Sequence, residues 1–160
     1  VSVTGAFDDA AASLYGNVIV TDNLHRKVLR TFPIEDHCVL LLVPSEKAYT
    51  ADVDLRRIKT VAKQVETAHK EAFAGNYWNA MTLNGLIYSH VLRLSTDVII
   101  QSLEAGALAA GISGKGPAYA FVAQKQFKNA VLDVLKEYNG QVIVSKTRRR
   151  PSLPAPIPQR

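Results

Sequence analysis

Cysteine, methionine and tryptophan occur only once each in the 160 residues of the chain. The single cysteine, Cys38, excludes an intrachain disulfide, and such sparing use is typical of a cytoplasmic protein. Because Cys38 lies in an apolar run, it is predicted to be a small buried hydrophobic residue rather than a nucleophile. The four histidines have no metal-ligand spacing with one another or with Cys38, so no metal site is predicted from them.

Long hydrophobic runs are absent as well. The longest, residues 38–43, falls far short of the about 18 residues that a membrane-spanning helix needs, so no membrane partner is expected. Hydrophobic residues nevertheless make up 48% of the chain, which excludes disorder of the whole chain. The sequence begins at Val1 without a methionine, and we therefore expect a piece of a longer protein.

The net charge of +5 is concentrated at one end of the chain. Five residues account for all of it: Lys146, Arg148, Arg149, Arg150 and Arg160. Prolines also crowd the last ten residues, so a disordered basic tail is predicted over residues 148–160. A solvated end is favoured over a nucleic-acid surface, because the rest of the chain is neutral.

Hydrophobic periodicity predicts an α+β domain in which helices pack on an antiparallel sheet. Strands are expected at residues 18–21, 27–32, 38–43, 118–123 and 142–144. Helices are expected at residues 4–15, at about 55–73 as one long helix, and at 77–92, 96–105 and 125–138. Cap and stop residues support these bounds, among them Thr4 before the first helix and Gly16 after it.

Two adjacent carboxylates, Asp8 and Asp9, lie near the start of the first predicted helix. The helix dipole favours negative charge there, so stabilisation of the first turn is one interpretation. Neighbouring helical residues point about 100° apart, which excludes a matched acid–base pair. One carboxylate facing a pocket while the other stabilises the turn is the second interpretation.

A glycine-rich segment, residues 111–117, lies between two apolar strands. Glycine permits positive φ and a close approach of the backbone to a ligand, and such a loop can bind phosphate through successive amides. The spacing is not that of a Walker loop. A tight hairpin without a ligand remains the alternative.

Taken together, these segments resemble the GHMP small-molecule kinases. The string VTGAFDDAAASLYGNVIVTDN is followed by GNYWNAMTLNGLIYSHVL and EAGALAAGISGKGPAYAFVA, and the resemblance is strongest to the archaeal-type shikimate kinases. It covers about residues 1–145. The proline-led phosphate loop of the family's amino-terminal half is absent, so the resemblance implies the carboxyl-terminal portion of such a kinase. On this basis residues 1–37 belong to the end of the amino-terminal region and residues 38–147 to the carboxyl-terminal domain.

The resemblance also implies roles for individual residues. Asp9, seven positions before Gly16, matches the catalytic carboxylate, and Asp8 would cap the helix or bind substrate. The family's third motif, beside phosphates and substrate, matches Gly111, Ser113, Gly114 and Gly116. Arg57 resembles an arginine that binds the substrate carboxylate, although a solvated helix arginine is an equal alternative.

Three features depart from the family. Asn17 replaces the second glycine of a pair, Lys115 replaces a small residue, and the basic tail has no counterpart. The implied partners are shikimate, ATP and Mg²⁺, together with the missing amino-terminal half of the kinase. Alternatives are a kinase of the homoserine or mevalonate type, or a non-enzymatic fragment that binds nucleic acid through the arginines of residues 148–150.

Overall fold

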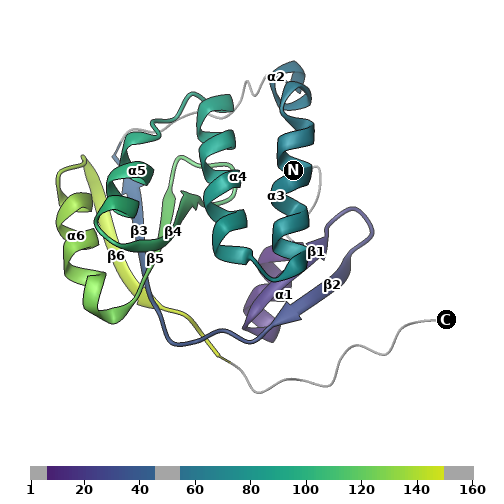
Figure 1. Ribbon diagram of the computed structural model, residues 1–160, viewed down its shortest axis with the longest axis horizontal. Helices are drawn as coiled ribbons and strands as arrows, with labels where there is room; N and C mark the ends of the chain where they lie inside the picture. Colours follow the sequence, from purple (N-terminus) through teal and green to yellow (C-terminus); the bar gives the residue numbers. More distant parts are fainter. Residues whose placement is uncertain (1–6, 46–54, 150–160) are drawn as a thin grey trace. The chain divides into compact units, whose positions relative to one another are not determined.

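The computed structural model describes residues 7–45 and 55–149 (Figure 1). The chain divides into two compact units, each with its own sheet. The first unit is Val1–Asp36 with Thr147–Arg160, and the second is His37–Lys146. Thr4, predicted as a helix cap, and residues 150–160 of the predicted tail lie outside the described residues. Among the described helices, none is long and apolar enough to cross a bilayer.

The first unit consists of helix α1 (Phe7–Tyr15) and a hairpin of strands β1 (Val18–Asp22) and β2 (Lys27–Phe32). Gly16 ends α1 as predicted. Its φ of 62° is left-handed, which glycine adopts without steric cost, and its amide donates to the Ala12 carbonyl at 2.9 Å. Ala11 is the buried residue of α1, and Val20 is buried in β1.

The turn of this hairpin is held by Asp22. Its carboxylate accepts hydrogen bonds from the His25 backbone amide at 3.0 Å and from His25 Nδ1 at 2.6 Å. These bonds, the backbone one foremost, hold the pKa of Asp22 below its usual value. The turn therefore depends on an ionised carboxylate.

The second unit contains a four-stranded antiparallel sheet with the order β4-β5-β3-β6. Its strands are β3 (Cys38–Pro44), β4 (Ala107–Ile112), β5 (Tyr119–Ala123) and β6 (Gly140–Lys146). Helix α5 (Asp97–Glu104) and helix α6 (Lys128–Lys136), which follows the short 3₁₀ helix η2 (Lys125–Phe127), pack on one face of the sheet. The predicted α+β class with an antiparallel sheet and packed helices is confirmed.

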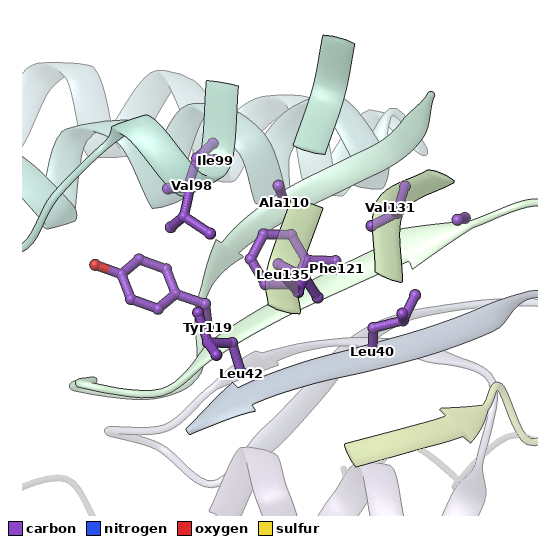
Figure 2. Packing of buried hydrophobic residues seen from close by; sticks show 10 residues of the cluster. Leu40, Leu42, Val98, Ile99, Ala110, Tyr119, Phe121, Val131 and Leu135 are labelled. Carbon is purple, nitrogen blue, oxygen red and sulfur yellow. The ribbon is translucent and has the colours of Figure 1, made fainter. Parts of the chain in front are cut away.

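The hydrophobic core lies between that face of the sheet and the two helices (Figure 2). Alternate residues of the strands point into it, as the period of two requires. Its fully buried members include Leu40, Leu42, Ile99, Phe121, Val131 and Leu135. Cys38 is half-buried at the start of β3, where it packs against this core, so its predicted burial is only partial.

The predicted long helix is two helices, α2 (Leu55–Thr60) and α3 (Ala62–Ala74). The break is at Val61, whose φ of −102° and ψ of 11° leave the helical region. Its amide donates to the Ile58 carbonyl at 3.2 Å, three residues back, so the chain turns more tightly there. At the other end, Gly75 with φ 97° closes α3, a left-handed helix end that favours glycine.

Helix α4 (Tyr77–Val91) contacts the outer edge of β4 through small residues. A Cβ on Gly85 would lie 2.4 Å from the Gly111 Cα and 2.9 Å from the Ala110 carbonyl oxygen. Thr82 Oγ1 accepts a hydrogen bond of 3.3 Å from the Ala110 amide. A helix therefore covers this edge of the sheet, which limits further strand pairing there.

Candidate functional site

Asp8 and Asp9 lie in the first turn of α1, and both are exposed. The helix forms because alanines follow them and Gly16 terminates it. Since the two carboxylates occupy consecutive helical positions, they point in different directions from the axis. Either can meet a substrate while the other stabilises the helix N-terminus.

The glycine-rich segment of the second unit forms the connection between β4 and β5. The Ser113 amide donates to the Ala118 carbonyl at 2.8 Å, and the Gly116 amide donates to the Ser113 carbonyl at 3.0 Å. Gly114 and Gly116 have φ values of 60° and 72°, which explains why glycines stand there. The loop is thus a hairpin, and its binding of a ligand stays a prediction. The amides of Gly114 and Lys115 take no part in these two bonds, so the hairpin is compatible with an anion at the loop tip.

The space around the loop differs between its two left-handed glycines. A Cβ on Gly114 would meet no atom within 4 Å, whereas one on Gly116 would lie 2.8 Å from Leu94 Cδ1. Ser113, Gly114 and Lys115 are exposed. The tip of the loop is therefore open to a ligand, and its return arm rests on the connection between α4 and α5.

That connection is itself anchored to the sheet. The hydroxyl of Tyr119 donates to the Ser95 carbonyl at 3.0 Å, and burial raises the pKa of Tyr119. The raised pKa keeps the hydroxyl in its donating form up to a higher pH than that of a free tyrosine. Tyr119 and Leu94 position the loop, a role that the sequence interpretation did not assign to them.

Gly111 does not belong to the loop itself. It lies buried within β4, where a Cβ would lie 2.9 Å from the Met81 carbonyl oxygen of α4 and 3.3 Å from the Gly85 Cα. The helix and strand approach so closely that neither position accommodates a side chain. The isolated Gly85 within an otherwise helical pattern was the sequence signal for this contact.

Arg57 lies on α2 in the same unit as the loop and is half-buried. Its Nη2 donates to the His90 carbonyl at the end of α4, at 3.2 Å. A guanidinium has five N–H donors in a planar fork, so this bond fixes its orientation and leaves the others for a carboxylate. Arg57 thus has one backbone partner in the protein, and its contact with a substrate carboxylate stays a prediction.

Carboxylates, histidines and the cysteine do not gather into a metal centre in the part of the chain that the structure describes. No group of three or more such side chains is close enough to hold a metal ion there. Asp8 and Asp9 are two adjacent carboxylates without a third ligand.

Known proteins resemble this chain over most of its length. No family model matches it. The shikimate kinase of Methanothermobacter thermautotrophicus is 40% identical over 145 residues, which are 91% of this chain and 50% of that protein. The shikimate kinase of Pyrococcus furiosus is 38% identical over 148 residues, 92% of this chain and 53% of its own length. The chain thus spans about half the length of these curated relatives.

Solved structures agree on the fold. The Leishmania major mevalonate kinase matches with a TM-score of 0.62 and 16% identity, over 93% of this chain and 54% of its own. The homoserine kinase of Cytophaga hutchinsonii matches with a TM-score of 0.51 and 17% identity, over 87% of this chain and 50% of its own. At such identities the likeness concerns the fold. This chain is therefore a relative of the shikimate kinases over about half of their length, and it shares the fold of mevalonate and homoserine kinases.

Proposed function

We propose that this chain is the carboxyl-terminal part of an ATP-dependent shikimate kinase, which phosphorylates a hydroxyl of shikimate to give shikimate 3-phosphate. The observation that carries the proposal is the 40% identity to a shikimate kinase over 91% of the chain. The 16–17% identities to mevalonate and homoserine kinases support the same fold but a more distant relation. The whole enzyme would belong to aromatic amino acid biosynthesis in the cytoplasm.

Asp9 is the proposed catalytic carboxylate. The shikimate hydroxyl oxygen forms the new bond to the γ-phosphorus of ATP, the bond from that phosphorus to the β–γ bridging oxygen breaks, and ADP leaves. The hydroxyl proton passes to Asp9. Exposure of Asp9 on the first turn of α1 supports this role, because a carboxylate must reach a substrate from outside the helix. Such proton transfer typically contributes about 10²–10⁴-fold.

Further contacts with substrate or phosphate are proposed residue by residue. Asp8 would hydrogen-bond substrate, the fork of Arg57 would pair with the shikimate carboxylate, and Ser113 at the open end of the hairpin would meet substrate or phosphate. Gly114 and Gly116 would bring backbone amides near the phosphates. Gly111 would act indirectly, because its lack of a side chain lets α4 pack closely on β4, the strand that leads into the loop.

ATP and Mg²⁺ are proposed to depend on the half of the kinase that this chain does not span. Magnesium prefers octahedral oxygen ligands and is usually held by one or two carboxylates with substrate phosphates. We assign its ligands, and the main phosphate loop, to the amino-terminal half, because the proline-led loop that the resemblance implies for that half does not occur in this sequence.

Two other functions compete with this one. A kinase of the homoserine or mevalonate type shares the fold, and a non-enzymatic fragment would use the exposed Arg148 and Arg149 to bind nucleic acid. If the chain binds nucleic acid in this way, its affinity should fall steeply as the salt concentration rises. The binding should also disappear when residues 146–160 are deleted.

A chimeric enzyme tests the proposal. The amino-terminal half of the Methanothermobacter relative is fused to residues 1–160, and ATP-dependent phosphorylation of shikimate, homoserine and mevalonate is measured. We expect turnover with shikimate and none with the other two alcohols. A folded chimera that prefers homoserine or mevalonate, or that phosphorylates none of the three, would contradict the proposal.

A further inference from the structure

The two edges of the four-stranded sheet differ. At the β4 edge, α4 packs along the strand, and Thr82 Oγ1 accepts a hydrogen bond from the Ala110 amide. At the β6 edge, on the opposite side of the sheet in Figure 1, no strand pairs with the outer side of β6 within the described part of the chain. A free strand edge presents unpaired backbone donors and acceptors and is a template for further pairing.

Strand β6 lacks the usual protection of an edge. Its seven residues pair with β3 in continuous register from Lys146 to Gly140 without a bulge. It contains no proline, and its only charge is Lys146 at the end. Proteins commonly protect edges with bulges, prolines or charges in the middle of the strand. A flat, regular edge of this length is therefore suited to pairing.

Apolar side chains lie exposed on both faces of this edge. Val144 pairs with Leu40, so it lies on the face that α5 and α6 cover, and it is 45% exposed. Ile143 pairs with Leu41 and points to the opposite face, where it is 41% exposed. Val43, also on that face, is 38% exposed. A strand added at this edge would cover apolar surface on both sides.

The sequence of β6 is self-complementary about Ile143. If two copies pair antiparallel with a twofold axis at this residue, Ile143 lies opposite its own copy and Val142 lies opposite Val144. Gln141 then faces Ser145, and Gly140 faces Lys146. Apolar residues meet apolar residues, Gln141 meets Ser145, and Lys146 faces a glycine instead of a like charge, as an isologous interface requires.

We infer that β6 is a dimerisation edge, at which two copies of this chain join their sheets into one eight-stranded antiparallel sheet. The partner is a second copy because the pattern of β6 matches itself in that orientation. The inference concerns the second unit alone, since β6 and β3 both belong to it. It is independent of the proposed kinase activity.

The oligomeric state of the full 160-residue chain tests the inference. We expect dimers in light scattering and sedimentation at about 100 µM, a concentration that populates weak interfaces. Ile143→Lys should raise the dimer dissociation constant about tenfold or more, because it buries a charge opposite its own copy. Ile100→Lys is the matched control, since Ile100 is 43% exposed on α5, a helix that packs mainly on β4 and α6 rather than on β6. It should leave the dimer unchanged.

A crosslink keeps the test decisive if Ile143→Lys unfolds. In a Cys38→Ser background, Ile143→Cys should form an interchain disulfide under mild oxidation, because residues directly opposite in an antiparallel pair lie close enough for one. Ile100→Cys should not. A monomeric wild-type chain, equal losses in both lysine variants, or equal crosslinking in both cysteine variants would overturn the inference.

Discussion

Among single residues, the adjacent carboxylates of α1 give the sharpest test of the proposed chemistry. In a complete kinase, Asp9→Asn should lower kcat by about 100-fold or more, because the amide cannot accept the hydroxyl proton. The KM for ATP should change little. Asp8→Asn is the matched control with the same exposure on the same turn, and it should cost less. A larger loss at Asp8 would assign the proton transfer to Asp8, and equal losses would contradict a special role for Asp9.

Arg57 combines a structural contact with a proposed contact to substrate. Losing a bidentate pair with the shikimate carboxylate should cost on the order of 2–3 kcal/mol, mainly as a raised KM for shikimate. Arg57→Ala also removes the hydrogen bond to the His90 carbonyl, so thermal unfolding must be measured alongside. The neighbouring exposed arginine gives the control Arg56→Ala. An Arg57→Ala enzyme with a normal KM for shikimate would remove Arg57 from the site.

Among elements, the contact between α4 and β4 predicts whether Gly85→Ala stabilises or destabilises the chain. Helix propensity alone would make Gly85→Ala stabilising by about 1 kcal/mol. Because the new Cβ would lie 2.4 Å from the Gly111 Cα, we expect it to destabilise instead, by about 1–3 kcal/mol or more. Urea unfolding monitored by circular dichroism measures the change. A stabilised variant would show that α4 shifts away from β4 at no cost.

The turn between β1 and β2 should depend on pH. The pKa of Asp22 is lowered in the folded chain by its hydrogen bonds with His25, so folding favours the ionised form. The contribution of Asp22 is therefore present above the carboxyl's usual pKa and is lost as the pH falls through the lowered value. Hydrogen exchange of the His25 amide should accelerate, relative to the unfolded chain, over that acidic range. Asp22→Ala should show fast exchange at every pH, and an unchanged pH profile would contradict this account.

At the scale of the whole molecule, we expect residues 1–160 alone to phosphorylate no shikimate. Catalysis of phosphoryl transfer rests mainly on positioning the nucleotide and stabilising its phosphates. The chain spans about half of its shikimate kinase relatives, and the main phosphate loop is assigned to the other half. A coupled assay for ADP checks this. Turnover within about tenfold of the chimera would refute the assignment of the nucleotide site to the other half.

Much of the fold follows from the sequence alone, because it depends on local chemistry. Gly16 ends α1, and the period-two pattern of β3 sends Leu40 and Leu42 to the same face. The helix-forming and strand-forming preferences of the segments are enough to predict the α+β class. The candidate residues Asp9 and Ser113 came from strings of sequence that resemble a kinase family, and their proposed roles remain predictions.

Only the tertiary structure decided which groups meet across long stretches of chain. One contact between α4 and β4 explains why Gly85 and Gly111 are both glycines. A Cβ on either residue would lie against the Cα of the other. The Arg57 bond to the His90 carbonyl and the support of the loop by Leu94 likewise join distant segments. The sequence contains the local preference of each segment, but burial and steric exclusion between segments exist only once the chain has packed.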